Sequence, residues 1–103
     1  MSLTVDKIAK LLVAHIQDNS LLEKIKDVDS DLFNSLSKKD TENLGFWLIM
    51  HSYFLDTVIK EINALNLSED DLLNSESVKN ILTKNIEQYI QNKQDKLSLK
   101  KFS

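Results

Sequence analysis

Residues 45–59 read GFWLIMHSYFLDTVI and form the most apolar stretch of this chain. Around them, residues step by four and three along one helical face, and the strict alternation of a strand is absent. The residues on this face are Leu44, Leu48, His51, Leu55, Val58, Ile62 and Leu65. Because aromatic and aliphatic residues also occupy the other faces, we expect one long helix over 41–66 that is buried on most sides.

Three further segments have apolar residues at helical spacing, at approximately 4–18, 21–36 and 75–95. Thr4 is expected to cap the first of these, and either Asp40 or Thr41 is expected to cap the long helix. The last helix is expected to begin at Ser75 or Ser77. Side-chain oxygens of these residue types accept hydrogen bonds from the exposed amides of a first helical turn.

The second helix has one uncertain position. Ser20 and Glu23 have the spacing of a capping box, which predicts a start near residue 21. The segment 27–31, DVDSD, could divide this helix in two, since Asp and Ser compete for backbone hydrogen bonds. The apolar spacing runs through the segment, which favours one continuous helix. The tail 96–103 keeps Leu97, Leu99 and Phe102, which are expected to dock on the bundle or on a neighbour.

The composition agrees with a helical fold. The 103 residues include one Gly and no Pro, and this disfavours a β-rich fold, which needs tight turns. We therefore predict a single domain over 1–103, an all-α compact four-helix (possibly five-helix) bundle with the long third helix at its centre. The isolated Gly45 is expected to allow close approach by another helix or by the Trp47 ring.

Charge and composition also limit the partners. All 13 basic residues are Lys, and the net charge is −3, so nucleic-acid binding is not expected. Residues 84–103 are basic, at +3, and residues 1–83 are acidic, at −6. The absence of Cys fits a reducing compartment, and no signal peptide is evident, so a cytoplasmic location is expected. The central stretch is too short and too polar for a membrane span.

Two metal sites can be considered. The segment 27–31 resembles the opening of a calcium loop, but the template then requires Gly and Glu where Leu32 and Lys38 stand. A second candidate set for metal binding within a bundle is His15, Asp18, His51 and Asp56. Neither His follows an acid by three residues, as a di-iron bundle would require. We therefore expect no metal and no cofactor.

No motif points to an enzyme. A phosphate loop needs several Gly, and adjacent Ser52 and His51 would face different directions on a helix. His51 instead occupies a position on an apolar face, where a polar residue can fix register and make assembly pH-sensitive.

The remaining candidate site is a protein interface. A helix that is apolar on all sides needs more partners than three amphipathic helices supply, and the uncovered remainder would be a contact surface. The predicted interface residues are Phe46, Trp47, Met50, His51, Tyr53 and Phe54. A core role is the alternative for this cluster.

The sequence therefore predicts a non-enzymatic protein-interaction module that forms a homo-oligomer or binds another protein. One alternative is a small metal- or ligand-binding bundle. The other is a membrane-surface or immunity-type helical protein. In size and helix number the chain is similar to the small immunity proteins of bacteriocin systems, a resemblance at the level of fold alone.

Overall fold

A computed structural model describes residues 2–102 of the chain and the side chains of residues 2–98. No strand occurs within the described residues, so the all-α prediction is confirmed. The elements are α1 (Val5–His15), α2 (Asn19–Val28), α3 (Ser30–Ser37), α4 (Thr41–Met50), α5 (Ser52–Asn63), the 3-10 helix η1 (Glu69–Asn74) and α6 (Glu76–Phe102).

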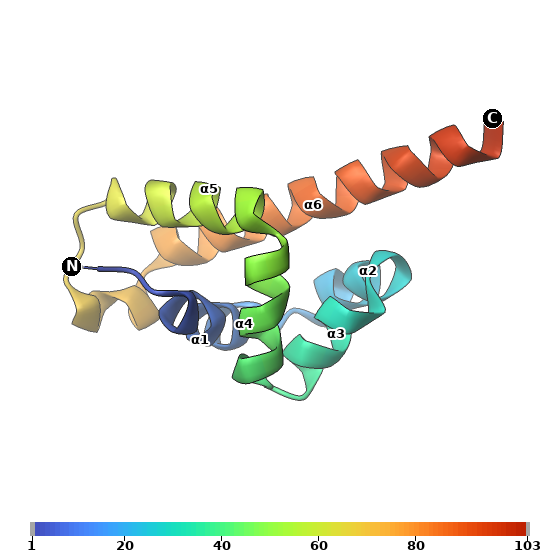
Figure 1. Ribbon diagram of the computed structural model, residues 1–103. Coiled ribbons are helices and arrows are strands. Elements are labelled where there is room, and N and C mark those ends of the chain that lie inside the picture. The colour runs from blue at the N-terminus through green and yellow to red at the C-terminus, as the bar shows by residue number, and fades with distance from the viewer. Residues whose placement is uncertain (1, 103) are drawn as a thin grey trace.

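The helices pack in two groups that share a core (Figure 1). α5 runs beside α6, and α1 packs against α4 and η1. The hairpin of α2 and α3 lies against α4 and α6. α4 crosses steeply between these groups and joins α5 at a sharp corner (Figure 1). The corner places one aromatic cluster where α3, α4, α5 and α6 come together.

α6 is longer than predicted. It continues to Phe102, so the predicted end near Asp95 and a separate tail over 96–102 are wrong. Its C-terminal turns project beyond the other helices (Figure 1). Leu97 is 49% exposed and does not dock on the bundle. The side chains of Leu99 and Phe102, which were expected to dock as well, lie outside the described residues.

Three predicted caps are confirmed. The side chains of Thr4 and Asp40 accept hydrogen bonds from the amides of Lys7 and Asn43, at 3.2 and 3.0 Å. Ser75 Oγ accepts from the amide of Val78 at 3.2 Å. Each residue satisfies an amide that lacks a partner within its own helix.

The turn between the first two helices differs from the prediction. α1 ends at His15 rather than at residue 18. Asp18 then caps α2, because its carboxylate accepts from the amide of Leu21 at 3.0 Å. Ser20 lies inside α2, so the predicted capping box is wrong. Because Asp18 already accepts a hydrogen bond from an amide of the first turn, the helix begins before Ser20.

The second helix is divided at Asp29, so the prediction of one helix over 21–36 is wrong. Asp29 has extended backbone angles, and its amide donates to the carbonyl of Ile25 at the end of α2. Its carboxylate accepts from the amide of Leu32 at 3.0 Å and thereby starts α3. The same residue ends one helix and caps the next, which the apolar spacing alone does not reveal.

The long helix predicted over 41–66 is also divided, at His51. The His51 backbone departs from helical angles and its amide donates to the carbonyl of Leu48. The imidazole Nδ1 lies 2.7 Å from the carbonyl oxygen of Trp47, the usual partner of the His51 amide in a continuous helix. Because the ring satisfies this carbonyl, the chain can turn into α5 without leaving it unpaired.

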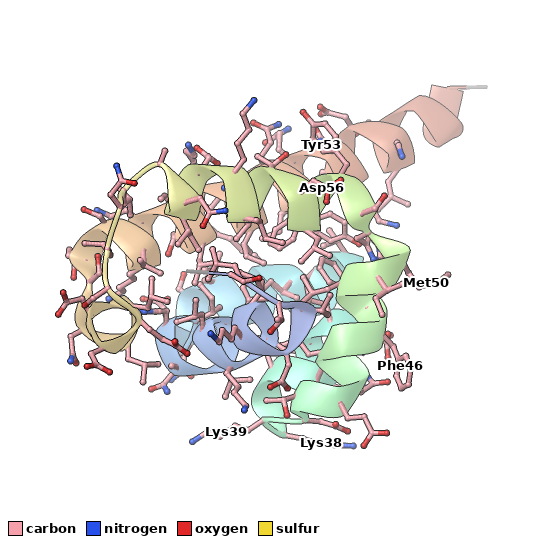
Figure 2. All side chains as sticks on the ribbon, turned by 60° about the vertical axis from the view of Figure 1, so that its left-hand side comes forward. Lys38, Lys39, Phe46, Met50, Tyr53 and Asp56 are labelled. Atoms are coloured by element: carbon pink, nitrogen blue, oxygen red, sulfur yellow. The ribbon has the colours of Figure 1, made fainter. Side chains whose placement is uncertain are left out.

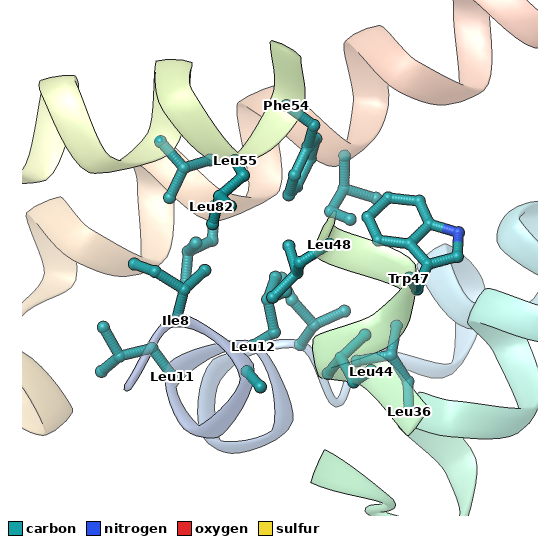
Figure 3. Close-up of a cluster of buried hydrophobic side chains, with 14 of the residues drawn as sticks. Ile8, Leu11, Leu12, Leu36, Leu44, Trp47, Leu48, Phe54, Leu55 and Leu82 are labelled. Atoms are coloured by element: carbon teal, nitrogen blue, oxygen red, sulfur yellow. The ribbon is translucent and has the colours of Figure 1, made fainter. Parts of the chain in front are cut away.

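The core fills the space between α1, α4, α5 and α6 (Figure 3). Ile8 and Leu12 of α1, Leu44 and Leu48 of α4, and Leu82 of α6 are fully buried. The central role of the 41–66 segment is therefore retained, although two helices fill it. Among the described residues, Ser35 of α3 is the buried polar one. Its hydroxyl accepts a hydrogen bond from Asn43 Nδ2 at 2.6 Å.

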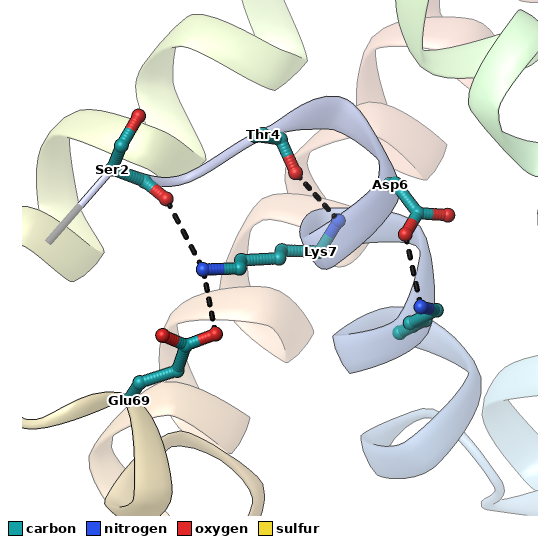
Figure 4. A network of polar contacts seen from close by, with 6 residues as sticks. Ser2, Thr4, Asp6, Lys7 and Glu69 are labelled. Atoms are coloured by element: carbon teal, nitrogen blue, oxygen red, sulfur yellow. Dashed lines mark hydrogen bonds and ion pairs between the residues drawn. The ribbon is translucent and has the colours of Figure 1, made fainter.

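The N-terminal end is tied to η1 by polar contacts (Figure 4). Lys7 Nζ lies 2.6 Å from Glu69 Oε1 and donates to the carbonyl of Ser2 at 3.5 Å. Gly45 does not mark the expected close approach. A methyl group there would lie 3.7 Å from Val5 Cγ1, an ordinary contact distance.

Candidate functional site

The structure divides the six predicted interface residues into two groups. Trp47 and Phe54 are 3% and 7% exposed and belong to the core. Phe46, Met50 and Tyr53 are 60%, 80% and 85% exposed, and His51 is half-buried between the groups. The cluster is therefore core on one side of the α4–α5 corner and open surface on the other.

The exposed side carries four large apolar side chains, which we call the apolar ridge: Phe46, Ile49, Met50 and Tyr53. The first three lie on one face of α4, and Tyr53 lies in the first turn of α5. Figure 2 shows Phe46 and Met50 pointing outward from α4 and Tyr53 pointing outward from α5. Ile49, at 59% exposed, was not among the predicted interface residues. Its spacing of three from Phe46 could have revealed it.

A small apolar hollow adjoins the ridge. Its volume is about 150 Å³, and it lies between the start of α5 and the middle of α6. The residues that line it are His51, Tyr53, Phe54, Asn85, Gln88, Tyr89 and Asn92. Tyr53 belongs to both the ridge and the hollow, so the two features form one surface.

A hydrogen-bond network holds the corner behind this surface. Asp29 Oδ2 accepts from Trp47 Nε1 at 2.9 Å and from the Tyr89 hydroxyl at 2.5 Å. His51 Nε2 lies 3.5 Å from the same hydroxyl. A carbonyl only accepts, so His51 Nδ1 must donate to Trp47, and the neutral imidazole carries its proton there. The role of Asp29 was not predicted, because no spacing rule connects this residue to Trp47 or Tyr89.

Ring contacts fix the same side chains. The Trp47 and His51 rings stack, with centroids 4.0 Å apart and an interplanar angle of 17°. Phe54 and Tyr89 meet the indole edge-on, at 5.3 and 5.2 Å. Such arrangements are favourable for aromatic quadrupoles. These contacts pack the rings of the corner together, and they hold the ends of α4 and α5 that carry the ridge.

The network changes the acidity of two of its members. Burial alone would raise the pKa of the Asp29 carboxyl, but hydrogen bonds from Tyr89, Leu32 and Trp47 outweigh it. The pKa of Asp29 is therefore held below its ordinary value. Burial and the hydrogen bond to Asp29 raise the pKa of the Tyr89 hydroxyl. At neutral pH the pair is a carboxylate and a neutral phenol, an arrangement suited to structure rather than to proton abstraction.

The metal candidates do not come together. His15 and Asp18 line a separate hollow, His51 lies in the corner, and Asp56 is exposed on α5. His15 Nε2 is 3.0 Å from the carbonyl oxygen of Leu72, and Asp18 caps α2. Across the residues that the structure describes, no group of three or more His, Cys, Asp or Glu could hold a metal ion.

The hollow beside His15 has a volume of about 550 Å³ and lies between the end of α1, the start of α2 and α6. Its charged lining residues are Asp18, Lys24, Lys79 and Glu87. The two acids offset the two lysines, so the lining has no net charge that would select an anion or a cation.

Comparison with protein-family models, curated proteins and solved structures finds no match for this chain. Within residues 2–102, each helix is too short or too polar to cross a bilayer.

Proposed function

We propose that this chain is a non-enzymatic protein-interaction module that self-associates through the apolar ridge. The observation that supports the proposal is the outward projection of Phe46, Ile49, Met50 and Tyr53 from one firm corner. A group of large apolar side chains exposed on a folded chain typically marks a contact with another macromolecule. Aromatic residues and Met are enriched in such contacts.

The size of the ridge favours association over an incidental exposure. Burying one large apolar side chain is worth about 1.5–3 kcal/mol, and association costs about 4–15 kcal/mol. Four side chains from each of two copies reach the range needed, even after allowance for their partial burial in the monomer. A single exposed side chain, such as Leu73 on η1, does not.

A non-enzymatic role agrees with the hydrogen bonds that His15, His51 and Tyr89 make within the chain. His15 and His51 each direct a ring nitrogen at a backbone carbonyl. The raised pKa of Tyr89 keeps its hydroxyl protonated at neutral pH, so it does not supply a general base. The proposal requires no cofactor. It also places the protein in the cytoplasm, where a chain without Cys needs no oxidising folding pathway.

Light scattering over a range of concentrations tests the proposal with a matched pair of variants. Ile49 and Leu73 are 59% and 58% exposed, and Leu73 lies on η1, away from the ridge. Wild type is expected to be a dimer or larger. Ile49→Lys should raise the dissociation constant at least tenfold, whereas Leu73→Lys should leave it unchanged. A wild type that is monomeric throughout would reject self-association. Trp47→Ala is unsuitable because it removes core packing.

A further inference from the structure

The hollow beside the ridge has the size of a single side chain. At about 150 Å³ it is smaller than the roughly 300–1,000 Å³ of ordinary small-molecule sites. The rings of His51, Tyr53, Phe54 and Tyr89 form much of its lining. An apolar side chain that filled it would contact several rings at once, as the central anchors of protein interfaces do.

The same face carries a side chain suited to such a hollow. Met50 is 80% exposed, and it directly precedes His51, which lines the hollow. Methionine is unbranched and flexible, so it adapts to irregular apolar space and makes favourable contacts with aromatic rings. A projecting side chain and a hollow that the next residue lines therefore both occur at the α4–α5 corner.

A surface that carries both features is complementary to itself. In a two-fold contact, residue i of one copy meets residue j of the other, and j meets i. A two-fold axis near Tyr53 would lay the α6 side of one copy against the α4–α5 side of its partner. We infer that two copies of this chain pack in this way, with Met50 of each copy seated in the hollow of the other.

The charges around the hollow agree with this arrangement. Asp56 is exposed on α5, one turn after Tyr53 (Figure 2). On the α6 side, Lys93 Nζ lies 5.8 Å from the centroid of the Tyr89 ring. The proposed contact brings Asp56 of one copy towards Lys93 of the other. Complementary charges of this kind favour the correct partner and orientation.

The chain itself makes the contact easy to map. It contains two Met, at positions 1 and 50, and no Cys. Replacing Met with photo-methionine keeps the shape of the side chain and places a light-activated group at position 50. Mixing protein labelled with heavy nitrogen and unlabelled protein before illumination separates links between copies from links within one copy. Peptide mass spectrometry then locates each link.

We expect mixed-isotope links from Met50 to the segment 85–92 of α6. The Ile49→Lys variant, treated in the same way, should lose them. Filling the hollow by Gln88→Trp should raise the dissociation constant of the dimer at least tenfold, because Gln88 is exposed and its replacement leaves the core intact. Leu73→Trp, on η1, is the control and should leave the dissociation constant unchanged.

This inference depends on the proposed self-association, and the outcomes separate the two. If the protein is a dimer but the links from Met50 lie elsewhere, or Gln88→Trp has no effect, the seating of Met50 is wrong and self-association stands. If light scattering shows a monomer and no mixed-isotope link forms, both are wrong. A ridge that binds only a different protein would give this second result.

Discussion

Replacing Asp29 with alanine tests what holds the corner together. The carboxylate caps α3 at Leu32 and accepts from Trp47 and Tyr89, so one substitution removes the hydrogen bonds that join the start of α3 to α4 and α6. Loss of an N-cap costs about 1 kcal/mol. A hydrogen bond to a charged group contributes about 1.5–3 kcal/mol. Asp29 is half-buried, so water can replace part of each bond, and alanine also relieves the burial of a carboxylate.

We therefore expect Asp29→Ala to lower the free energy of unfolding by about 2–4 kcal/mol. Urea unfolding followed by far-ultraviolet circular dichroism measures this change. Fluorescence is a poor probe, because the single Trp contacts the substituted residue. Asp31→Ala, which leaves the α3 cap in place, is the control. A loss below about 1 kcal/mol would show that solvent satisfies Trp47 and Tyr89, and that the network does not stabilise the corner.

The pH dependence gives an independent check of the same network. The pKa of Asp29 is lowered in the folded state, so the protein gains stability from its ionisation at pH values above the unfolded pKa of about 3.9. That contribution is lost as the pH falls through the folded-state pKa. The stability difference between wild type and Asp29→Asn should thus be constant from pH 5 to 7 and shrink below about pH 4. A difference that grows on acidification would contradict the assignment.

Three further predictions concern the backbone and the dynamics. Gly45→Ala should stabilise the protein by about 0.5–1 kcal/mol, since the added methyl meets Val5 at an ordinary distance; a loss of stability in urea unfolding would show that α1 and α4 cannot accommodate it. Lys39 has a φ of 56°, so Lys39→Gly should raise the free energy of unfolding by up to about 1 kcal/mol, and a decrease would refute this account of the turn. Amide hydrogen exchange should be faster over 94–98 of α6 than over 78–90, because the first segment is exposed and the second contributes to the core; equal protection would indicate that the projecting turns are covered by a partner.

The breaks between helices show where sequence reasoning stops. The caps at Thr4, Asp40 and Ser75 were predictable because each depends on a side chain within three residues of its partner. At Asp29 and His51 the apolar spacing continues across the break. At each of these positions a side-chain hydrogen bond to the nearby backbone replaces a hydrogen bond of the continuous helix. The spacing of apolar residues does not indicate where this happens.

The division of the predicted interface residues into buried and exposed ones could not be predicted, for a related reason. α4 is apolar on nearly all sides, so its sequence does not say which side faces the core. The packing of α4 against its neighbours decides this: Trp47 points inward onto Asp29 and Tyr89, and Met50 stays outside. Residues 18 and 60 positions apart in sequence meet in this network, and no local pattern connects them.

The sequence by itself determined the all-α class, the positions of the apolar faces and the starts of α1, α4 and α6, because these depend on composition and on contacts within one or two turns. Only the tertiary structure decided which half of the aromatic cluster is core, where the hollow lies and how Asp29 joins three helices. These features depend on how the helices turn at Asp29 and His51, and on side chains that meet from distant parts of the chain.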